Sequence, residues 1–583
     1  MIVMKKIFKS IIATVVAITL SGCWSLDYYP HDAISENNFL DRASDVTKLM
    51  AGTYTQMKNA WAFGYDFLFD SVTDIATGDY FQNYAMGISA YTDGWISGCW
   101  QQTYNVVQTA NTTIRLLQDV ETGTQAGEIT EAMKTQGIAE AKFLRALGYF
   151  RLICLFGDIP YYDETWDLPS NFSNMYVEIS PVSAVREKII NDLNDAERDL
   201  PSAWDTGNYG RATKWAAIAL RGKVKLYAKD YAGAASDFEN VINNGIAYGS
   251  TKLALDTDYA HVFKTWGTNS RCPEMIFSIQ YSNSYGSQTT ALMGNKSSLR
   301  QIPTDRMNPS PKLIDMYEKA DGTPFDWEEY LPGWTNGDRT KRMELSAVTI
   351  KVNNGIAYID NMLQADTSAM ARAYRERDPR LMVTAITPYS TYLGTTAGSV
   401  PQIFNYYLVD QTKSEFGPNE GNGCLRNNNG GFTPSYFVRK FVIEGNLGGE
   451  YNNAPFEWPI IRLADVMLMA AECYNETGND AKACEYVNKV RARVNMPPVS
   501  KSGDELRQYI RDERARELPF EGHRFFDIRR WGIGPQVVTG DATTIWGNRI
   551  YTMSYPTKHD VWPIPQVELD RTPDWKGSQK PGW

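Results

Sequence analysis

The sequence is poor in the residues from which thiol, histidine and zinc chemistry is usually built. Its 583 residues include four histidines, well separated, and seven cysteines, none of them in a CxxC pair. No GxSxG or HExxH run is present, so neither a serine hydrolase nor a zinc protease is indicated. Cys473 and Cys484 fall in predicted helices, where we expect them to be buried and to act as small apolar residues. No DxDxDG loop, the usual calcium-binding pattern, occurs. The question of a structural calcium ion stays open, and no cofactor is predicted.

Positive charge is also scarce. Residues 1–22 hold three lysines and no acid; without them the chain has 55 basic and 68 acidic residues and a formal charge of −13. No run of five or six like charges supplies a local basic patch. Binding to the phosphate backbone needs such a basic surface, so a nucleic-acid partner is not predicted.

The N-terminal apolar run is too short to span a membrane. It extends from Ile11 to Leu20, follows three lysines, and is followed by Ser21, Gly22 and Cys23. As a helix it would rise about 15 Å, half of the roughly 30 Å hydrocarbon core. Small residues before a cysteine are typical of a lipoprotein signal, which predicts cleavage before Cys23 and a lipid on its thiol. The alternative is an ordinary secretory signal with an incidental cysteine.

Aromatic residues are abundant: 16 Trp, 34 Tyr and 23 Phe make up 13% of the chain. Some of these rings are expected to be exposed or to line a groove, where a flat apolar face can stack on a sugar. The alternative is that the rings are buried in an aromatic-rich core, and this must be true of most of them. At this length one hydrophobic core is not sufficient, so two packed subdomains are expected.

Helical periodicity dominates the two ends of the chain. Helical spacing occurs over residues 36–60, 101–120 and 129–156, and two units, 211–245 and 463–495, resemble tetratricopeptide repeats. The small and aromatic positions of these repeats are taken by Gly222, Tyr231, Ala234 and Phe238 in the first unit and Ala471, Tyr474, Gly478 and Ala483 in the second. The prediction is a mainly α fold with a discontinuous TPR-like scaffold.

A different kind of sequence separates the two repeats. From about 266 to 458 the chain is rich in Gly, Asn, Pro, Thr and aromatic residues, with a short predicted strand at 275–280. Irregular loops on a rigid scaffold are where binding residues usually lie. The predicted organisation is a signal peptide at 1–22, a tether at 23–37, a helical part at 38–265, a loop-rich insert at 266–458 and a helical part at 459–583.

Several blocks, in order, resemble the SusD/RagB family of surface glycan-binding lipoproteins. They are the lipoprotein start with Leu26, Asp27 and Pro30; residues 140–160, EAKFLRALGYFRLICLFGDIP; Asp321–Gly322; Arg377 to Arg380; and the C-terminal tail with Pro563, Ile564 and Pro565. The most specific block is 510–532, IRDERARELPFEGHRFFDIRRWG. The final residue departs from the family's pattern, with Trp583 where Tyr is common.

The resemblance implies a non-enzymatic lipoprotein of the outer membrane, anchored through Cys23 and exposed at the cell surface. Such a protein would bind an oligosaccharide or polysaccharide and deliver it to a TonB-dependent transporter of the SusC type. Two alternatives stay open: a peptide-binding protein like RagB, and a surface glycoside hydrolase.

Three acids in the most specific block could suggest hydrolysis. Glu513, Glu517 and Glu521 recur at four-residue steps, and a pair of nearby carboxylates is what a glycosidase needs. Six arginines are interleaved with them, however, and guanidinium groups keep carboxylates ionised, whereas a general acid needs a raised pKa. Structural ion pairing is therefore predicted, with His523 as a packed structural residue.

Ligand contacts are expected where aromatic and polar residues alternate outside helices. Trp95 and Trp100 are placed just before a helix, beside Gln101, where the family has an aromatic platform. For each aromatic residue, the alternative to ligand contact is burial in the core. The complete prediction for ligand binding is Asp79, Tyr80, Trp95, Trp100, Gln101, Tyr285, Arg300, Trp327 and Trp334.

Overall fold

The structure is a computed structural model of the chain, and it describes most residues from position 40 onward. The described residues are 40–64, 66–78, 81–166, 171, 177–264, 271–282, 307–354, 356–361, 369–395, 401–410, 415, 435–442, 444 and 454–583. Cys23 and the predicted tether lie outside them. None of the helices in these ranges combines the length and the apolarity needed to cross a bilayer.

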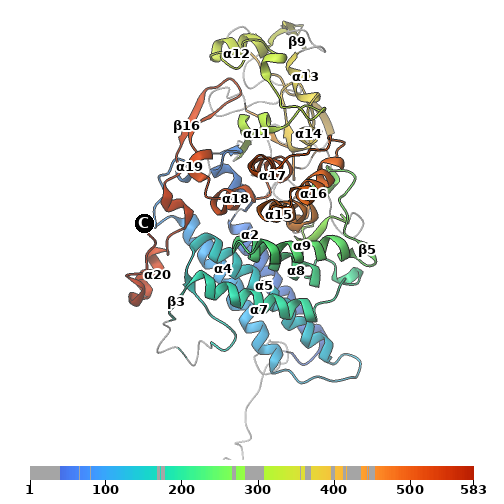
Figure 1. The fold of residues 1–583 in the computed structure, drawn as a ribbon, viewed down its shortest axis with the longest axis vertical. Helices are drawn as coiled ribbons and strands as arrows, with labels where there is room; N and C mark the ends of the chain where they lie inside the picture. Colours follow the sequence, from blue (N-terminus) through green and yellow to red (C-terminus); the bar gives the residue numbers. More distant parts are fainter. Residues whose placement is uncertain are drawn as a thin grey trace, which may run out of the picture.

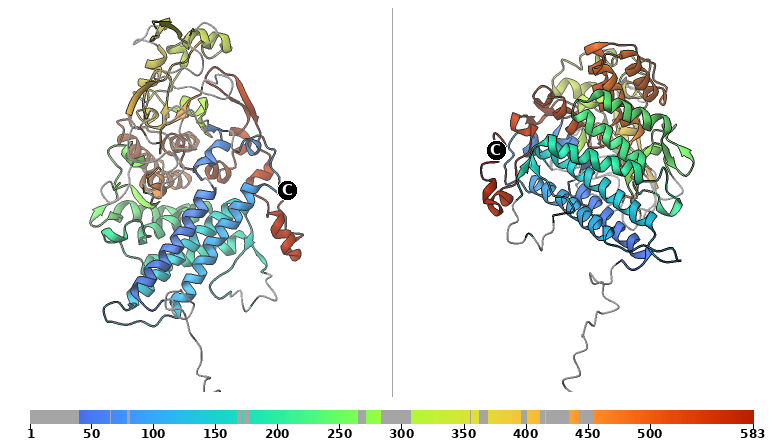
Figure 2. Two further views of the ribbon diagram at one scale, coloured as in Figure 1. Left: turned by 180° about the vertical axis from the view of Figure 1, so that it is seen from behind. Right: turned by 60° about the horizontal axis from the view of Figure 1, so that its bottom comes forward.

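A row of antiparallel helices forms the N-terminal part. Each helix packs on the next one along the chain: α2 on α4, α4 on α5, α5 on α7, α7 on α8 and α8 on α9. Figure 1 and the left view of Figure 2 show this row in the lower half of the molecule. The bounds are Ala43–Gly64 for α2, Gly94–Gln118 for α4, Glu131–Phe156 for α5, Val182–Asp199 for α7, Lys214–Tyr227 for α8 and Tyr231–Asn244 for α9.

Helices α8 and α9 form the hairpin that the first repeat predicts. The Thr213 side chain accepts a hydrogen bond from Ala216 N at the start of α8, and Asp230 caps α9 in the same way. A Cβ placed on Gly222 would lie 2.6 Å from a ring carbon of Phe238. The glycine is therefore needed because the two helices approach each other closely here, as the repeat pattern predicts.

The C-terminal helices continue the same row after the insert. Helix α15 packs on α9, and it also contacts α16 and α17. Ala471 and Ala483 are fully buried, as expected of the second repeat, and Gly478 has φ +80° in the turn between α15 and α16. The discontinuous TPR-like scaffold is therefore confirmed. The bounds are Leu463–Glu476 for α15, Asp480–Ala492 for α16, Gly503–Glu517 for α17, Arg524–Arg530 for α18, Gly534–Val537 for α19 and Gln566–Arg571 for α20.

The insert leaves and rejoins the scaffold at one small sheet. Strand β6, Met275–Ile279, confirms the strand predicted at 275–280 and pairs antiparallel with β14, Trp458–Arg462, which leads directly into α15. Between these strands the chain forms short helices and hairpins at the top of Figure 1. They are β7 (Asn308–Pro309), α11 (Pro311–Met316), α12 (Arg339–Ser346), β8 (Thr349–Asn353), β9 (Ile356–Asn361), α13 (Ala369–Arg375), α14 (Arg380–Thr384), β10 (Ala385–Ile386), β11 (Thr391–Thr395), β12 (Pro401–Asn405) and β13 (Phe437–Val438).

Aromatic packing joins the two ends of the chain. Trp562, near the C-terminus, packs edge-on against Trp95 with ring centroids 4.9 Å apart, and Phe525 stacks on Phe69 at 4.8 Å. Much of the aromatic content therefore serves the core. The remaining short elements are β1 (Ala76–Thr77), α3 (Gln82–Ala85), β2 (Ile159–Pro160), β3 (Ile179–Ser180), β4 (Ile246–Tyr248), β5 (Thr251–Lys252), β15 (Gly540–Thr543) and β16 (Arg549–Met553).

Candidate functional site

Trp95 and Trp100, two of the predicted ligand rings, lie inside helix α4 and face the core. The helix begins at Gly94, and the Asp93 carboxylate accepts a hydrogen bond from Trp95 N at 2.8 Å. Trp95 stacks on Phe81 with ring centroids 3.7 Å apart. Both tryptophans are buried. Neither ring has an open face for a sugar in this structure, which corrects their expected position outside a helix.

The sequence held a signal for this earlier helix start. Aspartate is a preferred N-cap residue, and Asp93 is followed by Trp95, Cys99, Thr103 and Val106, which are all buried on one face. Extending the helical period of 101–120 backward would have included both tryptophans. The alternation of aromatic and polar residues before 101 had instead predicted a segment outside the helix.

The other predicted ligand residues are divided between the core, the surface and undescribed segments. Trp327 and Trp334 are buried with ring centroids 4.9 Å apart, and the Trp327 ring N–H donates to Asp315 Oδ1 at 2.8 Å. Gln101 is exposed on α4. The remaining predictions, Asp79, Tyr80, Tyr285, Arg300 and the lipid site Cys23, lie outside the described residues.

The three glutamates of the C-terminal block form a buried ion-pair network. Glu513 contacts Arg380 at 2.7 Å, Glu517 contacts Arg462 at 2.8 Å, and Glu521 contacts Arg462 at 2.6 Å. These side chains are all fully enclosed, and the predicted structural ion pairing is confirmed. The network joins α14 and β14 to helix α17 and to the turn that follows it. Further members are Glu274, Asp378, Lys440, Arg491, Arg493 and Arg516.

The electrostatics of this network are opposite to those of a general acid. Burial alone would raise the pKa of Glu513, but Arg380, Arg516 and Arg491 outweigh burial and lower it to about 2. The pKa of Glu517 is lowered in the same way. Carboxylates held this firmly in the ionised form cannot donate a proton to a glycosidic oxygen near neutral pH. Burial lowers the pKa of His523 to about 4, as suits a packed neutral imidazole.

An open groove lies elsewhere among the described residues, beside the β11–β12 hairpin. It is a groove of about 710 Å³ between that hairpin, helices α13 and α14, and the segment after β13. Apolar and charged groups are mixed along it. Leu393 and Ile403 expose 38% and 63% of their surface on the hairpin. The polar lining includes Lys264, Arg375, Thr391, Arg439 and Glu444.

Tyr389 stands in this groove with a strained backbone. Its φ is +64°, a left-handed conformation that is rare for an aromatic residue. Two hydrogen bonds hold it there: Tyr389 N donates to Tyr406 O at 2.7 Å, and the phenol donates to Ser346 O. A strained backbone conformation persists only where the surrounding structure imposes it, and such residues cluster at functional sites. The half-buried ring of Tyr389 is thus fixed at the groove wall.

Glu444 organises the charged part of the groove. It pairs with Arg439 at 2.9 Å and with Lys264 at 3.6 Å. Arg439 also donates to Met382 O at 2.9 Å, which fixes the guanidinium plane. Among the described residues that line the groove, Glu444 is the one carboxylate. The arrangement offers hydrogen-bonding groups beside a ring, and it does not offer the carboxylate pair of a glycosidase.

Comparison with known proteins decides the family. The sequence profile described as the SusD family matches residues 273–583, more than half of the chain. The chain belongs to the SusD family. A second profile, described as "Starch-binding associating with outer membrane", matches residues 24–226 of this SusD-family protein. The resemblance seen in the sequence blocks is therefore confirmed.

Similar proteins cover three quarters or more of the SusD-family chain. SusD-like protein P25 of Formosa agariphila is 25% identical over 95% of both chains. Starch-binding protein SusD of Bacteroides thetaiotaomicron is 23% identical, over 76% of this chain and 73% of its own. The crystal structure of a SusD-like protein from Bacteroides fragilis matches with a TM-score of 0.72 at 24% identity, covering 95% of this chain and all of its own.

This SusD-family protein is expected to lose stability as the pH falls from 4.5 to about 2. The pKa of Glu513 is about 2 when folded and ordinarily 4.5, so the unfolded chain takes up this proton first. The stabilisation of the folded state by ionised Glu513 is complete above pH 4.5 and is lost as the pH falls through 2. The lowering of the Glu513 pKa from 4.5 to about 2 corresponds to ~3 kcal/mol of folding free energy. Thermal unfolding at successive pH values should show its steepest loss there.

The Glu513→Gln variant isolates this contribution. Burial lowers the pKa of His559 from 6.5 to about 3, so protonation of that ring also destabilises the acidic protein, beginning at a higher pH. The variant keeps His559 and removes the Glu513 titration. We expect it to be less stable than wild type at neutral pH and to converge with wild type near pH 2. If the stabilities of the variant and the wild type instead change in parallel with pH, ionised Glu513 does not stabilise the folded state in this way.

Proposed function

We propose that the protein is a lipid-anchored receptor of the outer-membrane surface that binds an oligosaccharide or polysaccharide. In this proposal it delivers the glycan to a TonB-dependent transporter of the SusC type and does not cleave it. The observation that carries the proposal is the match of residues 24–226 to a family described as starch-binding and outer-membrane-associated. Cys23, after its short apolar run, would provide the anchor.

The groove beside the β11–β12 hairpin is our proposed glycan site. Tyr389 would supply a ring for stacking, because its position is fixed and ordering it costs little entropy. Arg439 and Glu444 would exchange hydrogen bonds with sugar hydroxyls. The groove's volume, about 710 Å³, suits a ligand of a few sugar rings. The sequence-predicted contacts in undescribed segments, Asp79, Tyr80, Tyr285 and Arg300, remain part of the proposal.

A peptide is the second candidate ligand. Strands β11 and β12 form a two-stranded sheet within the described residues, and an extended peptide can add to a sheet edge through backbone hydrogen bonds. Exposed Leu393 and Ile403 would favour apolar peptide side chains, and Arg375 could pair with an acidic one. Glycans remain the first choice because of the family description of residues 24–226.

Calorimetry with a panel of glucan oligosaccharides and peptides tests the proposal. We expect micromolar to millimolar affinity for a glycan, and a loss of about fivefold or more in Tyr389→Ala, since stacking on one ring contributes ~1 kcal/mol or more. Tyr91→Ala is the matched control, because Tyr91 is 43% exposed and does not line the groove.

Each contrary result has a distinct meaning. Unchanged affinity in Tyr389→Ala would remove the groove from the proposal but keep glycan binding. Peptide binding without glycan binding would favour the second candidate. Release of new reducing ends from a glycan incubated with the wild type would contradict the non-enzymatic role.

A further inference from the structure

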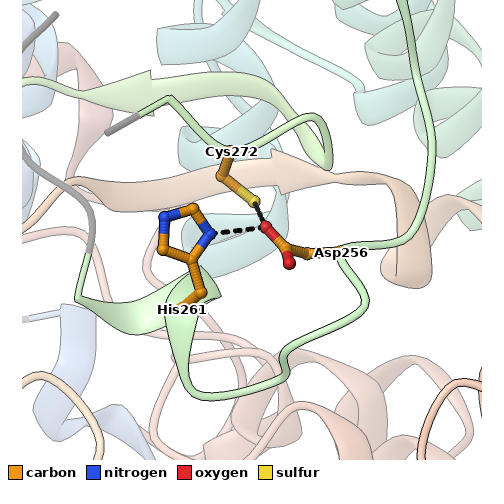
Figure 3. Close-up of side chains that lie close together, drawn as sticks. All are labelled: Asp256, His261 and Cys272. Carbon is orange, nitrogen blue, oxygen red and sulfur yellow. Dashed lines mark hydrogen bonds and ion pairs between the residues drawn. The ribbon is translucent and has the colours of Figure 1, made fainter. Parts of the chain in front are cut away.

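A cluster of three different metal-binding side chains contains no residue of the groove lining or of the ion-pair network. Asp256, His261 and Cys272 bring one ligand atom each within 4.8 Å of the others. His261 Nδ1 lies 2.6 Å from Asp256 Oδ2, and Cys272 Sγ lies 3.5 Å from the same oxygen. Figure 3 shows the three side chains pointing toward one another. We propose that these three residues bind one Zn²⁺ ion.

The order of the three groups argues against a catalytic thiol. In a nucleophilic triad the imidazole lies between the nucleophile and the carboxylate. Here the carboxylate of Asp256 is in the centre and hydrogen-bonds both His261 and Cys272. The cluster therefore lacks the activated nucleophile of a thiol enzyme.

The donor atoms fit zinc better than calcium or magnesium. A nitrogen, a sulfur and one carboxylate are typical zinc ligands, whereas calcium takes six to eight oxygens. Bonds of about 2.0 to 2.3 Å around a tetrahedral zinc ion would separate the ligand atoms by roughly 3.3 to 3.7 Å. The cluster needs only small side-chain movements to reach this spacing. Zinc would displace the thiol proton and the proton shared between Asp256 and His261, and the fourth position would take water.

The backbone holds the cluster in place before any ion binds. Asp256 Oδ1 accepts a hydrogen bond from Asp258 N at 3.0 Å, which turns Oδ2 toward the other two ligands. Asp256 N donates to Glu274 Oε2 at 3.2 Å, and Arg493 holds that carboxylate at 3.0 Å. Tyr259 OH is anchored on Glu517 O at 2.6 Å. Outer groups of this kind orient ligands and raise metal affinity.

His261 forms the side of the cluster that faces solvent. The side chain of His261 is 36% exposed, whereas Asp256 and Cys272 are buried behind it. Rotation of His261 would open the path and then complete the site. The position between strand β5 and strand β6 is also where the insert leaves the scaffold, so a bound ion would fasten the loop that carries His261 to the start of β6.

Titration of the full chain with metal alone tests the site. The protein is purified in detergent, stripped with a chelator and titrated with zinc by calorimetry and with cobalt by absorbance. We expect one zinc ion per chain and a sulfur-to-cobalt charge-transfer band. Cys272→Ser should lose the band, and His261→Gln should bind zinc at least tenfold more weakly.

Cys484→Ser is the matched control, because it alters a buried cysteine whose Sγ donates to Lys501 O and which lies outside the cluster. It should retain both the band and the zinc affinity. The half-exposed His261 makes His261→Gln informative even if Cys272→Ser does not fold. Absence of stoichiometric zinc binding in the wild type, or wild-type affinity in His261→Gln, would overturn the proposal.

Discussion

The free energy of unfolding is expected to fall by ~3–5 kcal/mol when Arg462 is replaced by alanine. Arg462 contacts Glu274 at 2.6 Å, Glu517 at 2.8 Å and Glu521 at 2.6 Å, and all four side chains are inaccessible to solvent. Removing the guanidinium leaves three buried carboxylates that share the remaining cations, Arg493 among them. The cost comes from this uncompensated buried charge.

Urea denaturation of Arg462→Ala beside Arg198→Ala measures this effect. Arg198 pairs with Asp195 and Asp199 on helix α7, but its side chain is 66% exposed. Exposed pairs of this kind contribute little, so the control should change stability by less than ~0.5 kcal/mol. Equal shifts in the two denaturation midpoints would contradict the central position assigned to Arg462.

The sequence was sufficient to predict ion pairing in the C-terminal block but not the partners. Glutamates and arginines alternate along 510–532, and this local pattern indicates salt bridges. Arg380, Lys440 and Arg462, which complete the network, come from helix α14, the turn after β13 and strand β14, outside this block of the chain. Their pairing depends on how the insert packs against helix α17, and local spacing carries no information on that packing.

The helical scaffold was the most predictable part of the fold. Close helix contacts require small residues, so Gly222 and Ala471 identify the two repeats directly from the sequence. The same reasoning does not reach the insert. Strand β6 could be predicted from its apolar run, but its partner β14 lies about 180 residues later, and only the folded chain pairs them.

The groove illustrates why the candidate site could not be predicted. Its lining comes from five separate stretches, around Lys264, Arg375, Tyr389, Ile403 and Arg439, none of which forms a motif. The positive φ of Tyr389 is equally invisible, because the sequence offers no glycine or asparagine at that position. The alternation of aromatic and polar residues pointed instead to tryptophans, and the four that were predicted, Trp95, Trp100, Trp327 and Trp334, are buried.

Replacing Trp95 with alanine is expected to lower stability by ~3–5 kcal/mol, the usual cost of removing a large buried ring. The side chain is only 8% exposed. It stacks on Phe81 at 3.7 Å and packs edge-on against Trp562 at 4.9 Å, so the cavity would open at the contact between the two ends of the chain. Trp95→Phe should cost less, because a smaller ring still fills part of the space.

Chemical denaturation and calorimetry together distinguish this core role from ligand stacking. If Trp95 is a core residue, the folded Trp95→Phe protein keeps the ligand affinity of the wild type while its denaturation midpoint falls. Tyr91→Ala, three residues before the start of α4 and 43% exposed, should leave both quantities unchanged. A Trp95→Phe protein of wild-type stability with weakened glycan binding would instead return the ring to the ligand site that composition predicted, and would require α4 to expose that face when a glycan binds.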